Sequence, residues 1–284
     1  MLRNRADLRT LAYLAAASAL PVAQWTAESF QPLLFAASIV MAFAVGVMHH
    51  NHQHAPLWRA RALNELTDCW FTLFQGHPGY AFGPSHLRNH HRHRNGALDY
   101  TRTWRRHDGN SLLGLVAHPA QFAATIAPVL GRHLARSWRL RRAQFWRAAG
   151  HYALLAAVTG AALAADWAKA VLFVLLPQAA ALFFLLVSNY LQHAHADERS
   201  AWNHSRNFLG WVNPLFFNVG YHTAHHLHAG AHWSELPRLH AAIAPRIDPR
   251  LIEPGLAHYC LRVFLLGALL PRLRSLPLGA PRTG

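Results

Sequence analysis

The sequence is poor in cysteine and in acidic residues, and both shortages exclude classes of site. It has two cysteines, Cys69 and Cys260, and neither belongs to a CxxC pair. This excludes a disulfide framework and a cysteine-rich zinc site. Only 12 Asp and Glu accompany 27 Lys and Arg, so oxygen ligands for calcium or magnesium are scarce. A GxGxxG nucleotide fingerprint and a ferredoxin cysteine set are also missing.

The excess of basic residues has two possible meanings, and the apolar residues decide between them. A formal net charge of +15 and a sequence pI near 11.3 would suit a partner made of nucleic acid or anionic lipid. However, 52% of the residues are hydrophobic, and they are gathered into long blocks separated by arginines. This pattern is typical of a membrane protein, and we expect no nucleic-acid partner.

The apolar blocks predict an all-α fold, an integral membrane helical bundle of about four spans forming a single domain over residues 1–284. A minimal turn at Asp166 joins the last two blocks. The stretch 111–130 is also apolar, but it contains His118, Pro119 and Pro128, so we expect a helix on the membrane surface there. The expected spans are residues 11–24, 30–48, 148–165 and 167–191.

The arginines predict the orientation of these spans. The segment from Arg59 to Arg147 contains fourteen arginines, both ends included, whereas the short turns near Glu28 and Asp166 have almost none. The positive-inside rule therefore places both termini and the long middle segment in the cytoplasm. Residues 49–147 and 192–258 are expected to form a histidine-rich cap on that side.

Histidine is abundant, with 23 copies, and it recurs in clusters at the ends of the apolar blocks. Residues three or four apart share one face of a helix, so His50 and His54 are expected to point together, as are His86 and His90. The selected candidates are His50, His54, His86, His90, His91, His193, His222, His225 and His226.

Nine imidazoles exceed the four to six ligands that one metal ion accepts, so the pattern implies two ions. Neutral imidazole is a good ligand for iron, zinc, copper and nickel. Soluble di-iron bundles use Glu and Glu-x-x-His ligands, and acidic residues are scarce near these clusters. We therefore expect two transition metals in an all-nitrogen shell. Iron is the preferred identity, while copper and zinc stay open.

The ordered motifs HNHQH, HLRNHH, NYLQH and HTAHH resemble the histidine boxes of the membrane fatty acid desaturase and hydroxylase superfamily. The second and third of these are closer in form to alkane monooxygenases, and the stretch NHSRNFLG…NVGYHTAHHLHAGAHWSELPRLH is similar to bacterial fatty acid desaturases. The resemblance spans about residues 30–245. It implies that the nine histidines bind two iron ions, with Asn189 and His49 as additional candidates.

The resemblance also implies an activity: an oxygen-dependent oxidoreductase of lipid metabolism that desaturates a fatty acyl chain, in a bacterial inner membrane. The alternative within the superfamily is a hydroxylase (monooxygenase) of alkyl chains, terpenoids or carotenoids. A metal transporter or histidine-rich metal buffer is the alternative from a different class. The enzyme would need electrons from a separate donor of ferredoxin, rubredoxin or cytochrome b5 type and a reductase. Its catalytic residues would be the metal ligands themselves.

Overall fold

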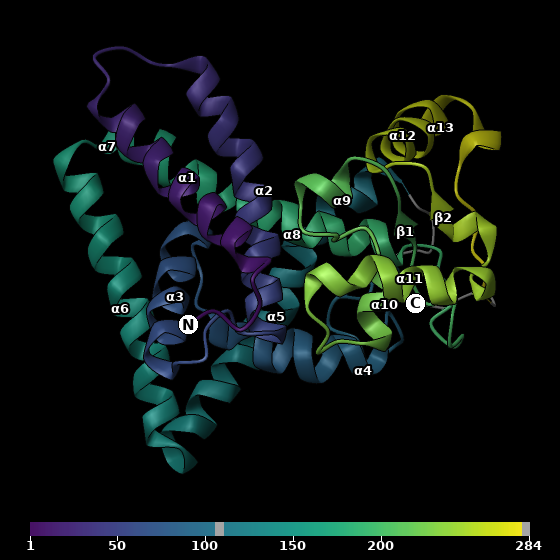
Figure 1. Ribbon diagram of the computed structural model, residues 1–284, viewed down its shortest axis with the longest axis horizontal. Helices are drawn as coiled ribbons and strands as arrows, with labels where there is room; N and C mark the ends of the chain where they lie inside the picture. The colour runs from purple at the N-terminus through teal and green to yellow at the C-terminus, as the bar shows by residue number, and fades with distance from the viewer. Residues whose placement is uncertain (106–110, 280–284) are drawn as a thin grey trace. The chain divides into compact units, whose positions relative to one another are not determined.

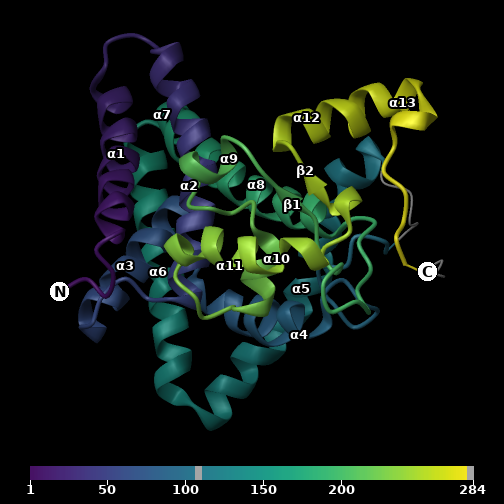
Figure 2. The same cartoon turned by 45° about the vertical axis from the view of Figure 1, so that its right-hand side comes forward.

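Helices make up nearly all of the regular structure in the computed structural model, which describes residues 1–105 and 111–279 (Figures 1 and 2). This confirms the all-α prediction. The chain folds into two compact units, and each is assembled from two separate segments. Unit 1 consists of Met1–Gly83 and Val129–Leu185, and unit 2 consists of Pro84–Pro128 and Leu186–Gly284. Two long helices, α5 and α8, run from one unit into the other.

Unit 1 is built mainly from long apolar helices. Its elements are α1 (Asp7–Thr26), α2 (Pro32–His54), α3 (Arg61–Gln75), η1 (Gly79–Ala81), the last part of α5 (Leu112–Leu140), α6 (Arg142–Ala165), α7 (Trp167–Ala170), η3 (Val171–Leu175) and the first part of α8 (Leu176–His193). The helices α1 and α2 form a hairpin. Gln24 Nε2 donates to Ser38 Oγ across it, at 2.8 Å.

Unit 2 has shorter elements with longer connections. They are η2 (Gly83–His90), α4 (His91–His93), the first part of α5, the end of α8, β1 (Asn207–Phe208), α9 (Val212–Leu215), α10 (His222–Leu227), η4 (Trp233–Glu235), α11 (Leu236–Ile243), η5 (Ala244–Arg246), η6 (Pro249–Leu251), β2 (Ile252–Glu253), α12 (Leu256–Cys260), η7 (Leu261–Leu266), α13 (Gly267–Leu269) and η8 (Pro271–Leu273). The strands β1 and β2 pair in parallel.

The short elements of unit 2 are held by a small core and by one buried arginine. Ala224 of α10 packs with Leu236, Ile243 and Leu251, all of them buried. Arg206, only 2% exposed, connects the end of α8 to the chain around β2. Through these contacts the last histidine box is fixed to a folded C-terminal segment.

Four helices are long and apolar enough to cross a membrane: Pro32–His54, Leu112–Leu140, Arg142–Ala165 and Trp167–His193. The expected number of four is confirmed, but one member differs. The expected surface segment 111–130 belongs to the long helix α5, and α1, where a span was expected at 11–24, is not among the four. Only 6% of the apolar window of Arg142–Ala165 is buried inside the protein. This leaves an apolar surface that suits contact with lipid.

The break between the last two spans lies where the sequence predicted it. The Asp166 carboxylate accepts a hydrogen bond from the Lys169 backbone N–H at 3.0 Å and caps the following helix. Pro177 lies at the start of α8, and it does not break the helical segment Trp167–His193. Instead, the turn before it, Val171–Leu175, is wound as a π-helix, which accommodates the missing backbone donor.

Gly220 is a position at which the fold of unit 2 requires glycine. A Cβ on this residue would lie 2.1 Å from the carbonyl oxygen of Phe208 and 2.6 Å from Asn213 Oδ1. We expect Gly220→Ala to lower the free energy of unfolding by about 1–3 kcal/mol or more, because the backbone of β1 must move. Thermal unfolding of the purified protein measures this.

The matched control is Gly230→Ala. A Cβ on Gly230 has no atom within 4 Å among the described residues, so its unfolding midpoint should stay close to that of the wild type. Equal midpoints for the two alanine variants would contradict the close packing at Gly220.

Candidate metal centre

The nine candidate histidines come from short elements and helix ends. His50 and His54 lie in the last turns of α2. His86 and His90 lie on η2, and His91 begins α4. His193 ends α8, and His222, His225 and His226 lie on α10.

Four of these side chains form a cluster within unit 2, which we call the four-histidine cluster: His90, His193, His222 and His226. Each offers one ring nitrogen, and these nitrogens lie within 4.8 Å of one another. His222 Nε2 is 3.0 Å from His193 Nε2 and 3.1 Å from His226 Nε2. His90, His193 and His222 are buried. Three distant segments of the sequence therefore present imidazole nitrogens to one small volume.

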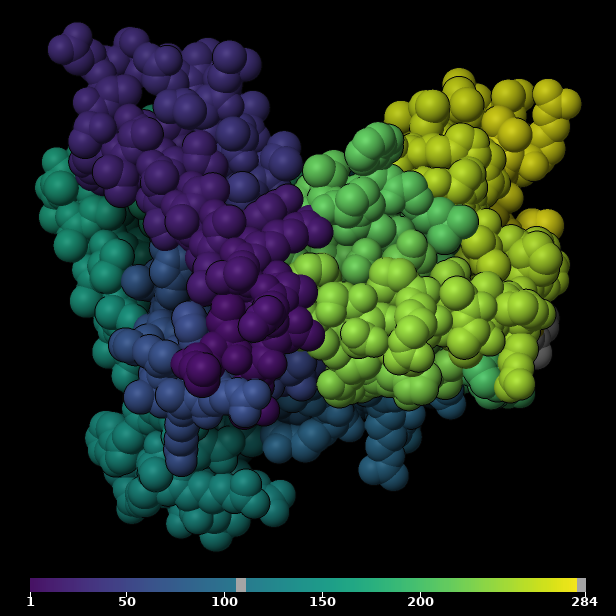
Figure 3. All heavy atoms as spheres, viewed as in Figure 1, coloured from purple at the N-terminus to yellow at the C-terminus, as the bar shows by residue number. Residues whose placement is uncertain are grey.

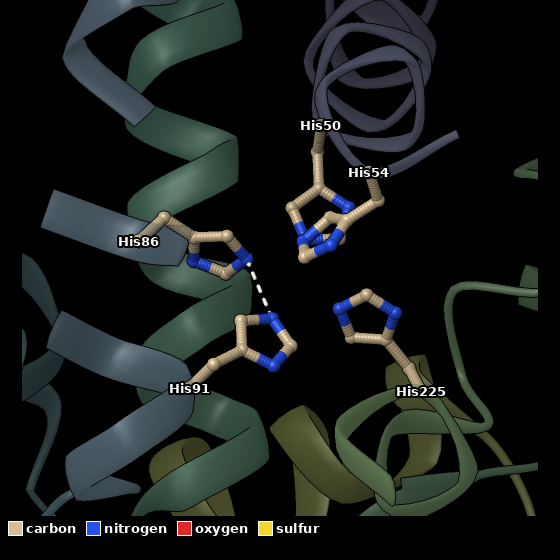
Figure 4. A group of neighbouring side chains, drawn as sticks. All are labelled: His50, His54, His86, His91 and His225. Carbon is tan, nitrogen blue, oxygen red and sulfur yellow. Dashed lines mark hydrogen bonds between the residues drawn. The ribbon is translucent and has the colours of Figure 1, made fainter. Parts of the chain in front are cut away.

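Three other histidines of unit 2 form the three-histidine cluster: His86, His91 and His225. His86 Nε2 and His91 Nε2 are 3.1 Å apart, and the ring centroids of His91 and His225 are 4.9 Å apart. Figure 4 shows the rings of His86 and His91 turned toward each other, with the dashed line between their nitrogens. This cluster alone provides three ligands, fewer than a transition metal normally takes.

The two remaining candidates, His50 and His54, belong to unit 1. They are four residues apart on α2, and their ring centroids are 4.7 Å apart. Figure 4 shows both side chains leaving the same helix. The predicted common face of this pair is therefore present.

Hydrogen bonds fix which ring nitrogen carries the hydrogen in two members of the four-histidine cluster. His90 Nδ1 donates to Asp99 Oδ2 at 2.8 Å, and His193 Nδ1 donates to the carbonyl oxygen of His204 at 3.0 Å. A neutral imidazole carries one hydrogen. The Nε2 atoms of His90 and His193 consequently present lone pairs.

The direction of these lone pairs indicates whether the residues can bind a metal ion. The Nε2 lone pairs of His90 and His193 are buried, and a cation placed among the ring nitrogens of the cluster would accept them. Burial, followed by the neighbouring histidines, lowers the pKa of His226 well below its ordinary value, so this ring stays neutral and can donate its electron pair. The donor set therefore fits a transition metal ion.

The carboxylate of Asp99 is buried beside the four-histidine cluster. Besides the hydrogen bond from His90, Asp99 accepts hydrogen bonds from the backbone N–H groups of Asn95 and Thr101, each at 2.7 Å. Burial acts to raise the pKa of Asp99, but the interaction with His90 and these hydrogen bonds lower it below the ordinary value. Asp99 is thus an ionised acceptor that fixes the orientation of His90.

Asn95 connects the second histidine box to the end of α8. Its Nδ2 donates to the carbonyl oxygen of His193 at 3.0 Å, and its own carbonyl oxygen accepts from Trp104 Nε1 at 2.6 Å. The backbone of Asn95 is left-handed, with φ of 70°, a conformation that asparagine tolerates better than most residues. The segment from Asn95 to Trp104 therefore holds two members of the cluster in place.

The two additional candidates lie in different surroundings. Asn189 Nδ2 is 3.2 Å from His90 Nε2, so Asn189 lies beside the four-histidine cluster. His49, by contrast, is packed within unit 1. It makes a short hydrogen bond with Gln75 Oε1, and its ring stacks on Phe71 at 4.8 Å. Gln75 and Phe71 contact His49 on a different side of α2 from the side that carries His50 and His54.

Sequence reasoning missed Asp99, Asn95 and the carbonyl oxygen of His204 as contributors to the site. Asp99 had a usable signal, because acidic residues are rare in this chain and this one follows the second histidine box by a few residues. Asn95 and the carbonyl oxygen of His204 had none, since their contribution depends on backbone positions that no local pattern encodes.

The chain was compared with families and with known proteins. The family described as fatty acid desaturase matches residues 23–253. No curated protein and no solved structure matches the chain.

Proposed function

The chain belongs to the fatty acid desaturase family, and on that premise we propose that it is an oxygen-dependent di-iron enzyme that introduces a double bond into a fatty acyl chain. The observation that carries the proposal is the four-histidine cluster, in which ring nitrogens with oriented lone pairs converge in a buried site. Side chains cannot themselves oxidise an alkyl chain, so such a cluster in this family is best explained as a ligand set for a redox metal.

We assign the ligands by the two clusters. His90, His193, His222 and His226 would hold one iron. His86, His91 and His225 would hold the other, and we propose that the pair His50 and His54 completes its set to five. This gives both ions only nitrogen ligands from the protein, with Asn189 beside the first.

Bound iron would supply, with dioxygen, the oxidising power needed to break an unactivated C–H bond. The protein's own residues keep the imidazoles neutral by burial and orient them. Asp99 fixes the ring of His90, the His204 carbonyl fixes the ring of His193, and Asn95 joins the two segments. The mostly unburied apolar helices keep the protein in lipid, where a fatty acyl substrate is available.

The surrounding requirements follow from the same premise. The sequence contains no haem, flavin or iron–sulfur motif, so we propose that a ferredoxin, rubredoxin or cytochrome b5 type donor and its reductase deliver the electrons. The arginine distribution supports a location of the histidines on the cytoplasmic side of a bacterial inner membrane.

Hydroxylation is the alternative outcome of the same chemistry, and the resemblance of the second and third boxes to alkane monooxygenases favours it. Lipid profiling of a host that expresses the chain separates the two reactions. New unsaturated acyl chains without hydroxylated products would support desaturation, and hydroxylated products alone would replace it with the alternative.

A metal transporter or histidine-rich buffer is the alternative from another class. Such proteins exchange their ions readily, whereas Asp99, Asn95 and the His204 carbonyl hold the four-histidine cluster in one fixed arrangement. This support by a second layer of hydrogen bonds is typical of metal sites with a defined ligand geometry.

The proposal is tested by the metal content of the purified protein. We expect about two irons per chain, because the ligands form two sets, and His258→Ala, which changes an exposed histidine, should leave this content unchanged. Elemental analysis after extensive dialysis measures it. Substoichiometric zinc or nickel that dialysis removes would refute the di-iron enzyme and favour the buffer.

A further inference from the structure

The turn between α5 and α6 concentrates positive charge on unit 1. Between residues 129 and 165 the sequence has no aspartate or glutamate, and it has arginines at 132, 136, 139, 141, 142 and 147. All six side chains are exposed. In Figure 3 the teal atoms of this turn lie at the surface. The turn is therefore a locally uncompensated basic surface.

Ion pairs within the protein do not account for these arginines. Arg147 pairs with Glu65 at 3.2 Å. For the five others, the described part of the chain provides no carboxylate partner within ion-pair distance. Elsewhere on the surface arginines do have such partners, for example Arg250 with Asp248 at 2.8 Å. Five guanidinium groups are thus available to an anion from outside the protein.

Aromatic side chains share this turn with the arginines. Trp138, Phe145 and Trp146 pack against one another with ring centroids 4.9–5.9 Å apart, and Trp138 and Trp146 are 40% and 61% exposed. The guanidinium carbon of Arg142 lies 3.5 Å from the ring centroid of Trp138. Stacking holds the guanidinium plane against the ring and leaves its N–H groups at the edge free to bind oxygen.

The position of the turn identifies the anion. It joins two helices that are long and apolar enough to cross a membrane and that bury little of their apolar surface, Leu112–Leu140 and Arg142–Ala165. Exposed tryptophans next to arginines at the ends of such helices are typical of the boundary between acyl chains and headgroups. We propose that this turn is a binding site for the phosphate groups of anionic phospholipids in the surrounding leaflet.

The test uses the full chain in neutral detergent. Phosphatidylglycerol and phosphatidylcholine are titrated separately, and the lipid bound per chain is counted by native mass spectrometry. We expect the wild type to prefer phosphatidylglycerol. The triple variant Arg136→Gln, Arg139→Gln and Arg142→Gln should bind it about a hundredfold more weakly, because each arginine near a lipid surface contributes about fivefold.

The control is the triple variant Arg61→Gln, Arg238→Gln and Arg250→Gln. It removes the same charge from exposed arginines that have carboxylate partners, and it should bind phosphatidylglycerol as the wild type does. If both triple variants lost the same affinity for phosphatidylglycerol, the loss would be explained by net charge alone, and the proposed site would be overturned. Equal binding of the two lipids by the wild type would also overturn it, as would displacement of phosphatidylglycerol by an equal concentration of inorganic phosphate.

Discussion

Replacing Asp99 by asparagine is expected to weaken iron binding and to lower activity by about 10- to 100-fold, because groups that orient a metal-binding histidine contribute effects of this size. Asparagine keeps the shape of the side chain but loses its charge. Its NH2 group would also face donors, since the carboxylate of Asp99 accepts hydrogen bonds from two backbone N–H groups, Thr101 Oγ1 and His90 Nδ1. The ring of His90 would no longer be held in one tautomer.

This effect is measured as the iron retained per chain against a competing chelator, together with the Mössbauer spectrum of the protein. We expect the spectrum of one iron to change and that of the other to persist, because the candidate ligand to which Asp99 bonds, among the described residues, is His90 of the four-histidine cluster. The control is Asp248→Asn, which alters a carboxylate that binds Arg250. An unchanged spectrum and unchanged iron retention in Asp99→Asn would contradict the orienting role.

Replacing Glu253 by glutamine is expected to destabilise unit 2 by about 3–5 kcal/mol, the usual cost of leaving a buried charge without its partner. Glu253 Oε1 accepts from Arg206 at 3.1 Å and from Arg262 at 2.7 Å. Arg206 is only 2% exposed, so its charge would stay buried. In a protein of this size the unfolding midpoint should fall by about 10 °C or more.

The midpoint should be measured on metal-free protein, so that a change in iron binding does not add to the change in unfolding. Glu235→Gln is the matched control, because Glu235 pairs with Arg238 where both side chains are well exposed. Such surface pairs contribute little, and its midpoint should stay near that of the wild type. Equal midpoints for Glu253→Gln and Glu235→Gln would show that the buried pair is not formed.

The sequence was sufficient to predict the features that depend on local pattern. Each histidine box lies on or beside a helix, so the spacing of His50 and His54 predicted their common face. The turn at Asp166 was predictable because a single polar residue separates two apolar blocks, and the structure confirms it.

The division of the histidines between two clusters was not predictable. Helical spacing grouped His86 with His90, and the three histidines His222, His225 and His226 follow one another on α10. In the structure His86 and His225 join His91, while His90 joins the four-histidine cluster. Which nitrogens meet depends on how distant segments pack, and helical spacing carries no information about that.

The expected spans and the helices that are long and apolar enough to cross a membrane differ in one member, for a physical reason. Pro119 and Pro128 favoured a helix on the membrane surface at residues 111–130 over a span, since proline removes a backbone donor. Yet α5 continues through both prolines to Leu140. Helices in lipid tolerate proline better than soluble helices do, because nearby groups can satisfy the freed carbonyls.

The π-helical winding of η2 (Gly83–His90) has a consequence for the chemistry of variants. In a π-helix residue i bonds to residue i+5, and this wider coil brings His91 next to His86 although five positions separate them. Deleting one residue between them would restore ordinary winding and rotate the imidazoles that follow the deletion within η2 and α4. The result would be a transfer of side chains between the two histidine clusters, so we expect chain length in this stretch to be as strictly constrained as the identity of the histidines.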